Sequence, residues 1–76
     1  MNTTIKQFEL THQDLEKLVG TNDMISIPES DYGLADVYHT NGKFEVYGIP
    51  MYGGEPQLEF VDSNAQLTLS YIQKIC

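Results

Sequence analysis

Few residues of this 76-residue chain have the chemistry of a catalytic group, and the sequence places none beside a group that would activate it. His12 stands at the start of an expected helix, where the helix dipole disfavours a positive charge. His39 falls on the apolar face of an expected strand, where a histidine is more often packed than catalytic. Cys76, the single cysteine, would be a nucleophile only beside a base and an oxyanion donor, and neither is indicated. We therefore expect that the protein is not an enzyme.

Eleven aspartates and glutamates supply acidic clusters, but their patterns do not match known ion or phosphate sites. A hydrolytic carboxylate pair needs an apolar pocket that raises the pKa of one acid, and so short a chain offers little depth for one. The cluster of Asp23, Glu29 and Asp31 lacks the alternating oxygens, central glycine and closing glutamate of a calcium loop. Gly53-Gly54 is a poor phosphate cradle, because no lysine follows and Glu55 would repel the anion. We expect no metal and no cofactor.

The formal net charge is −7, because eleven acids stand against four lysines and no arginine. Such a charge repels nucleic acid and anionic membranes and attracts basic protein surfaces. The alternative is that the acidity only keeps a small domain soluble. No apolar run approaches the roughly 20 residues of a membrane span, and the N-terminus lacks the basic-then-apolar pattern of a signal peptide. The sequence therefore favours a cytoplasmic protein without direct nucleic-acid or membrane binding.

The segment 35–47 has the pattern of a β-hairpin. Asn41-Gly42 tolerates the positive φ angles of a type I′ turn, and both flanks alternate apolar and polar residues. A two-residue turn fixes the register, so one face is apolar and the other polar. The apolar face carries Ala35, Val37, His39, Phe44 and Val46. The polar face carries Asp36, Tyr38, Thr40, Lys43, Glu45 and Tyr47.

The remaining elements are expected to pack around this hairpin. Thr11 and Asp14 can cap a helix over 12–19, with Leu10 and Leu15 at the two staple positions. The other expected elements are an edge strand or extended arm at 3–10, a strand at 24–27 that Pro28 stops or places at an edge, an acidic loop at 29–33 and a third meander strand at 57–62. The expected core contains Val37, Phe44, Val46, Leu58 and Phe60 beneath Leu15, Leu18, Leu69 and Ile72.

The segment 64–75 fits two patterns. Apolar residues alternate from Ala65 to Tyr71, as in a strand, yet Ala65, Leu69, Ile72 and Cys76 also share one helical face. The flanks favour a helix, because Ser63 and Gln66 form a capping box and Lys74 lies in the last turn. That helix would leave Leu67 and Tyr71 as an outward stripe.

The run Ile49-Pro50-Met51-Tyr52-Gly53-Gly54-Glu55-Pro56 follows a strand and precedes another strand and a closing helix. In this layout, residues 43–75 resemble small uncharacterised bacterial and phage proteins with an Ile-Pro-x-Tyr-Gly-Gly-Glu-Pro loop. The resemblance implies three meander strands and a helix, and it carries no activity. Together the patterns predict one α+β domain spanning 1–76. Its small antiparallel sheet would hold the meander around Asn41-Gly42 and one or two short strands, with two helices packed on one face.

The predicted binding surface combines acids and tyrosines on the polar sheet face and in the loop beside it. Its residues are Asp36, Tyr38, Glu45, Tyr47, Tyr52, Glu55 and Glu59. Tyrosines give rigid contact area and acids orient a basic partner, so we expect a non-enzymatic acidic protein-binding module. The sharper form is a small phage or mobile-element inhibitor, anti-CRISPR-like, that blocks a basic nucleic-acid-binding surface. The alternative is a generic accessory or structural domain with an ordinary solvated sheet face, homodimeric through the Leu67 and Tyr71 stripe or a free strand edge.

Overall fold

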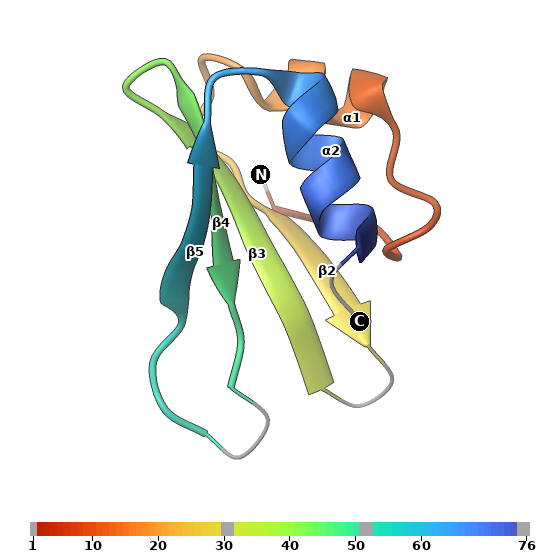
Figure 1. Cartoon of the computed structure of the whole chain (residues 1–76), viewed down its shortest axis with the longest axis vertical. Helices are drawn as coiled ribbons and strands as arrows, with labels where there is room; N and C mark the ends of the chain where they lie inside the picture. The colour runs from red at the N-terminus through yellow and green to blue at the C-terminus, as the bar shows by residue number, and fades with distance from the viewer. Residues whose placement is uncertain (1, 30–31, 51–52, 75–76) are drawn as a thin grey trace.

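The computed structural model describes residues 2–29, 32–50 and 53–74, which form a five-stranded sheet and two helices. The elements are β1 (Thr3–Thr4), α1 (His12–Leu18), β2 (Ile25–Glu29), β3 (Tyr32–Thr40), β4 (Lys43–Gly48), β5 (Gln57–Asp62) and α2 (Ala65–Lys74). Both helices cover the same face of the sheet (Figure 1), so the predicted α+β class is confirmed. Neither helix has the length and apolar character needed to cross a membrane within these ranges.

The central hairpin of β3 and β4 has the predicted register. Asn41 and Gly42 form the turn with φ angles of 53° and 78°, the left-handed region that a type I′ turn requires. Thr40 pairs with Lys43, and the pairing continues without a shift to Ala35 and Gly48. The two faces of the ribbon are therefore those that the alternation predicts.

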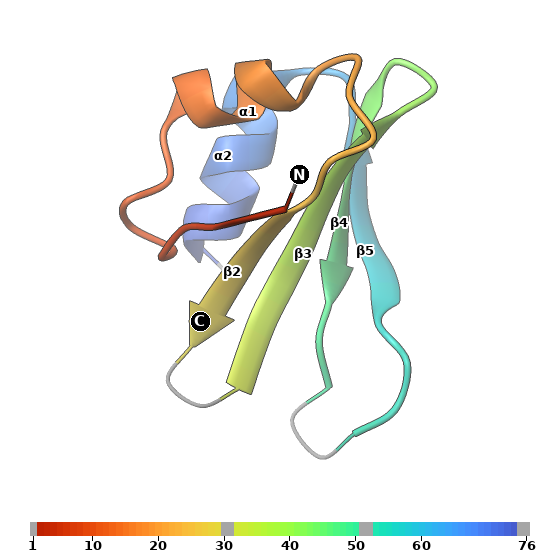
Figure 2. The same ribbon diagram turned by 180° about the vertical axis from the view of Figure 1, so that it is seen from behind.

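The strand order is β1-β2-β3-β4-β5, and the sheet is mixed. Of the edge strand or extended arm expected at 3–10, Thr3 and Thr4 are strand. This strand pairs with β2 in parallel, so the sheet, whose other pairs are antiparallel as expected, is mixed. The reason is the connection, because α1 carries the chain back over the sheet so that β2 runs in the same direction as β1 (Figure 2).

Strand β2 is longer than predicted. It runs through Pro28 to Glu29, with a bulge between Ile27 and Pro28. Pro28 is tolerated because β1 pairs only with Ile25 and Ser26, so that side of β2 is a sheet edge at the proline. Much of the expected acidic loop at 29–33 is therefore strand, since Glu29 pairs with Tyr32. Residues 30–31, which include Asp31, lie outside the described residues.

The core lies between the sheet and the two helices. Its members are Leu10, Leu15, Leu18, Ile25, Ile27, Ala35, Val37, Phe44, Val46 and Ile72, each at most 4% exposed. The predicted core members Phe60 and Leu69 pack at its margin. Leu58 is 49% exposed, so the prediction that it belongs to the core is wrong. The cause is a shift in the pairing of β4 with β5, which is described below with the outer residues of the sheet.

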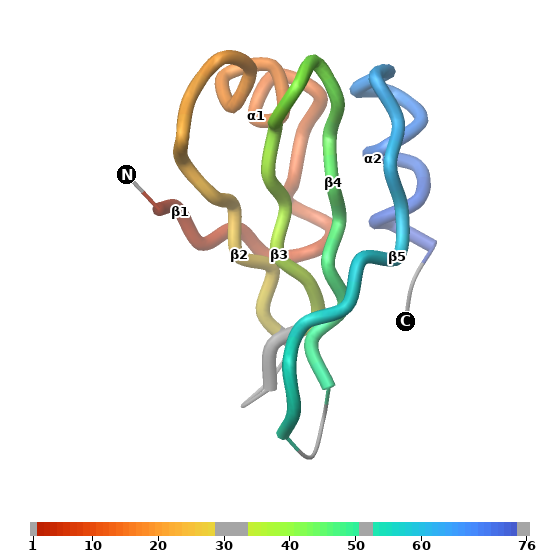
Figure 3. The backbone as a smooth tube through the Cα atoms, turned by 90° about the vertical axis from the view of Figure 1, so that its left-hand side faces the viewer, coloured from red at the N-terminus to blue at the C-terminus, as the bar shows by residue number. Residues whose placement is uncertain are grey.

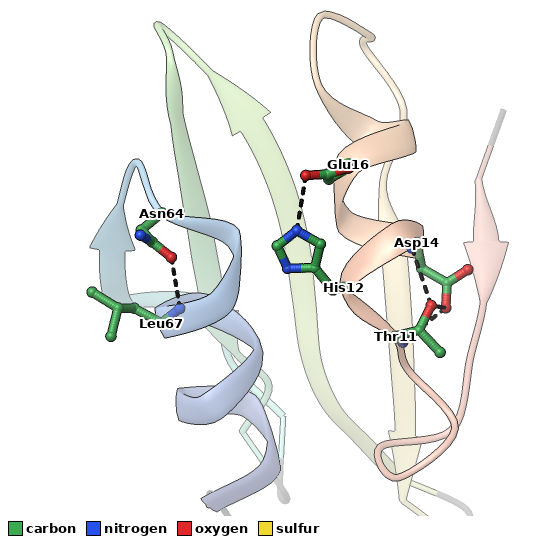
Figure 4. Close-up of polar contacts among 6 residues, drawn as sticks. All are labelled: Thr11, His12, Asp14, Glu16, Asn64 and Leu67. Carbon is green, nitrogen blue, oxygen red and sulfur yellow. Dashed lines mark hydrogen bonds and ion pairs between the residues drawn. The ribbon is translucent and has the colours of Figure 1, made fainter.

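Helix α1 begins with the expected cap (Figure 4). The Thr11 side chain accepts a hydrogen bond from the Asp14 backbone N–H at 3.2 Å, and the Thr11 N–H donates to the Asp14 carboxylate at 2.9 Å. Leu10 and Leu15 are both buried beside this capping box, as a hydrophobic staple requires. These contacts explain why a helix of only seven residues forms here.

The C-terminal segment is the helix α2, and the alternative strand assignment is excluded. Its cap is Asn64, one residue after the predicted Ser63: the Asn64 side chain accepts from the Leu67 N–H at 3.0 Å (Figure 4). Thr68 is fully buried, and its hydroxyl donates to the Asn64 carbonyl at 2.9 Å. That bond satisfies a polar side chain that is buried in the core.

The expected outward stripe of α2 is half wrong. Leu67 is 54% exposed, as predicted, whereas Tyr71 stacks on Phe60 with ring centroids 4.5 Å apart. Phe60 lies at the margin of the core on the edge strand, so it draws the Tyr71 ring against the sheet. Cys76 lies outside the described residues.

A hydrogen bond connects the segment before α1 to the C-terminal part of α2. The Gln7 side chain donates to the Ile72 carbonyl at 2.8 Å.

Truncating Phe44 should test the core. Phe44 is 2% exposed at its centre, so Phe44→Ala should lower the free energy of unfolding by about 3–5 kcal/mol in a urea titration. Phe8→Ala is the matched control, because Phe8 is 72% exposed and should change stability by less than about 0.5 kcal/mol. Equal effects of the two substitutions would contradict this core.

The cap of α2 gives a second test. Asn64→Ala removes the acceptor for the Leu67 N–H and should cost about 0.5–2 kcal/mol, whereas Ser63→Ala should be nearly neutral. Thermal melts of both variants would show whether Asn64 or Ser63 is the N-cap of α2. A larger loss from Ser63→Ala would restore the cap that the sequence pattern favours.

Candidate functional site

The face of the sheet turned away from the helices is here called the outer face (Figure 3). Asp36 and Tyr38 on β3, and Glu45 and Tyr47 on β4, lie on it, because the residues that alternate with them are buried on the helix side. A groove of about 470 Å³ runs over this face and is lined by all four of these residues. The structure thus brings together the central part of the predicted surface.

The ends of the groove come from two loops. Thr21, Asn22 and Asp23, between α1 and β2, line it together with Pro56, which precedes β5. The groove is therefore elongated along β3 and β4 and is not a round pocket. The α1–β2 loop was not predicted as part of the site, and nothing in its local sequence signals this long-range proximity.

Tyrosines and acids alternate across β3 and β4 in a set of four residues, here called the Tyr–acid cluster (Asp36, Tyr38, Glu45 and Tyr47). Tyr38 pairs with Glu45, and Asp36 pairs with Tyr47, so each ring stands opposite a carboxylate. The two rings meet edge to face, with centroids 5.6 Å apart and planes at 89°. This is the geometry that an aromatic pair prefers, and it holds both rings in defined orientations.

Hydrogen bonds fix the two acids. The Tyr47 hydroxyl donates to Glu45 Oε1 at 3.0 Å, and this bond is the main cause that raises the pKa of Tyr47. Burial raises the pKa of the Asp36 carboxyl, and a hydrogen bond from Ser26 offsets part of that increase. Asp36 is thus a partly desolvated acid in the middle of an acidic face.

Glu59 was predicted on this face, and the structure corrects that placement. The pairing of β4 and β5 moves from Val46 and Phe60 to Tyr47 and Leu58, which leaves Glu59 as the extra residue of a β-bulge. A side chain at Gly48 would overlap the Glu59 carboxylate. Because Gly48 pairs with the buried Ala35, that carboxylate lies on the helix side of the sheet.

The same bulge explains Leu58. It pairs with Tyr47, so the register turns Leu58 to the outer face, and Val61 lies there as well because it pairs with Glu45. These side chains are 49% and 41% exposed. They extend the outer face with apolar area that the alternation of the sequence did not predict for Leu58.

The remaining predicted residues contribute less. Glu55 is exposed in the loop immediately before Pro56, close to the groove in sequence but not among the residues that line it. Tyr52 lies outside the described residues. The predicted surface is thus reduced to its four sheet residues, with Glu55 at one end.

The histidines occupy structural positions. The His39 ring stacks edge to face on Phe44 at 4.7 Å and accepts a hydrogen bond from the Gly20 N–H at 3.5 Å. His12 Nε2 lies 2.8 Å from Glu16 Oε1 one helical turn away (Figure 4). Over the described ranges, His, Cys, Asp and Glu side chains do not gather in groups of three or more that could hold a metal ion.

The raised pKa of Asp36 predicts a pH-dependent effect of its removal. A carboxyl whose pKa in the folded state exceeds its ordinary value of 3.8 lowers the stability of the fold when it is ionised. Below pH 3.8 the carboxyl is protonated in both the folded and the unfolded state, so the loss of stability is absent there. Asp36→Asn should therefore raise the melting temperature near pH 7 and have no such effect near pH 3. A melting temperature at pH 7 that falls on substitution would contradict the desolvation of Asp36.

Comparisons of the chain with protein-family models, with curated proteins and with solved structures found no match.

Proposed function

We propose that the protein is a non-enzymatic binding module whose outer face docks on a basic surface of a partner protein. The observation that carries this proposal is the joint placement of two carboxylates and an ordered tyrosine pair along one groove of about 470 Å³. Tyrosine is enriched in interfaces because it offers a large rigid contact area at small entropic cost. The acids would speed and orient the encounter with a basic partner.

Three further features support docking of a macromolecule. Leu58 and Val61 are exposed beside the Tyr–acid cluster, so the outer face combines apolar contact area with charge. The groove is elongated and open, which suits a segment of a partner better than an enclosed small molecule. The net charge of −7 acts in the same direction at long range.

The sharper version of the proposal concerns the kind of partner. A nucleic-acid-binding protein presents lysine and arginine side chains for phosphate, and an acidic face competes for those same groups. A small inhibitor of phage or mobile-element origin, anti-CRISPR-like and acting in the cytoplasm, would work in this way.

The alternative function is an accessory domain that forms a homodimer. Leu67 is exposed and β5 is an edge strand, so the chain has surfaces that a second copy could cover. Self-association would bring together two chains of charge −7, and the bulge at Glu59 interrupts the β5 edge. A basic partner is therefore the better-supported occupant.

A matched pair of charge reversals tests the proposal. Glu45→Lys lies on the outer face, whereas Glu59→Lys makes the same change on the neighbouring strand with its side chain on the helix side. Each variant would be tagged and used to capture the partner from a lysate of the native host. Glu45→Lys should weaken capture at least about tenfold, and Glu59→Lys should weaken it much less.

Melting temperatures and salt dependence complete this experiment. Both variants should melt within a few degrees of the natural protein, so that lost capture reports on the surface and not on folding. Binding should also weaken as the salt concentration rises towards about 0.5 M. Capture of a partner that survives both Glu45→Lys and this salt concentration would show that the outer face is not the docking surface.

A further inference from the structure

We infer that the groove on the outer face seats an arginine side chain of the partner, with its guanidinium beside Tyr38 and Tyr47 and between the carboxylates of Asp36 and Glu45. This inference rests on the proposed docking of a basic partner, and it names the group that is recognised. Four side chains that line one groove carry it.

The aromatic part of the groove suits a flat cation. Tyr38 and Tyr47 stand at 89° to each other with centroids 5.6 Å apart, so the two rings are in edge-to-face contact, and a flat cation beside the pair would lie on a ring face that the other ring does not cover. A cation is attracted to the face of an aromatic ring by its quadrupole. A guanidinium can also stack flat on that face, which a tetrahedral ammonium cannot do.

The carboxylates flank the rings at positions set by the strand register. Asp36 stands opposite Tyr47, and Glu45 stands opposite Tyr38, so acids lie on both strands of the hairpin. The Tyr47 hydroxyl holds one oxygen of Glu45 at 3.0 Å and thereby orients the carboxylate before any partner arrives. Preorganised carboxylates favour the forked donors of arginine, which can make two parallel hydrogen bonds.

The state of Asp36 also favours a cationic ligand. Burial raises the pKa of this carboxyl, so its ionised form lacks part of the solvation that it would have in water. A guanidinium at hydrogen-bond distance would supply the missing stabilisation. The same group that costs the free protein stability would thus contribute to binding.

The shape of the groove indicates an arginine within a protein and not free arginine or a polyamine. The groove continues from the loop of Thr21–Asp23 past the tyrosines to Pro56, which leaves room for the chain on either side of the arginine. Its volume of about 470 Å³ lies within the roughly 300–1,000 Å³ of ordinary ligand sites. The exposed Leu58 and Val61 would contact the apolar surroundings of that arginine on the partner.

A peptide titration of the full chain tests the inference. Capped Gly-Arg-Gly, Gly-Lys-Gly and Gly-citrulline-Gly would be titrated separately into the ¹⁵N-labelled protein, with amide chemical shifts as the readout. The arginine peptide should bind about twofold to fivefold more tightly than the lysine peptide, and the shifts should centre on β3 and β4. Citrulline has the shape of arginine without its charge and should not bind detectably.

Two substitutions that each remove one negative charge provide the control. Asp36→Asn should weaken the arginine peptide at least about threefold, whereas Glu16→Gln on α1 should leave its affinity within about twofold. Equal affinity for arginine and lysine peptides, or equal effects of the two substitutions, would overturn the inference and leave only diffuse charge attraction.

The two proposals can fail separately. If Glu45→Lys abolishes capture of the partner but the groove does not prefer arginine, docking on the outer face stands and the arginine site is wrong. If the arginine peptide binds anywhere other than β3 and β4, the arginine site is wrong whatever the partner does. If capture survives Glu45→Lys, the proposed docking fails, and the inference that rests on it fails with it.

Discussion

The pairing of β3 with β4 is the constraint on which the rest of the structure depends. The two-residue turn at Asn41-Gly42 leaves one register available, and that register assigns every side chain of both strands to a face. Ala35, Val37, Phe44 and Val46 then form the floor of the core. A slip of one residue would exchange this apolar set with the acids and tyrosines, so the core and the candidate site are two results of one turn.

Both helices lie on one side of the sheet, so neither covers the outer face (Figure 1). Two short helices are enough to cover one side of a small sheet, and both are used on the apolar side. The outer face must therefore be stable in water, and cross-strand pairs of tyrosine and carboxylate contribute to that stability. The same pairs give the ordered aromatic and acidic groups from which we propose recognition of a basic partner.

The bulge in β5 changes the composition of both faces. It takes the Glu59 carboxylate to the helix side. Burial of the Tyr71 hydroxyl, and after it the negative charge of Glu59, raise the pKa of Tyr71. The glycine at position 48 leaves space for that carboxylate, because any larger residue would overlap it. In exchange, the outer face gains Leu58, so it becomes less acidic and more apolar at β5 than simple alternation predicts.

The sequence by itself determined those features that depend on neighbouring residues. Asn41-Gly42 and its alternating flanks predict the hairpin and four of the site residues, and Thr11 with Asp14 predicts the start of α1. Only the tertiary structure decided the parallel pairing of β1, the bulge that moves Glu59 and Leu58, and the stacking of Tyr71 on Phe60. Each of these depends on contacts between segments distant in the chain, for which local periodicity carries no signal. The groove belongs to the same class, because the α1–β2 loop and Pro56 reach the outer face only when the whole sheet is assembled.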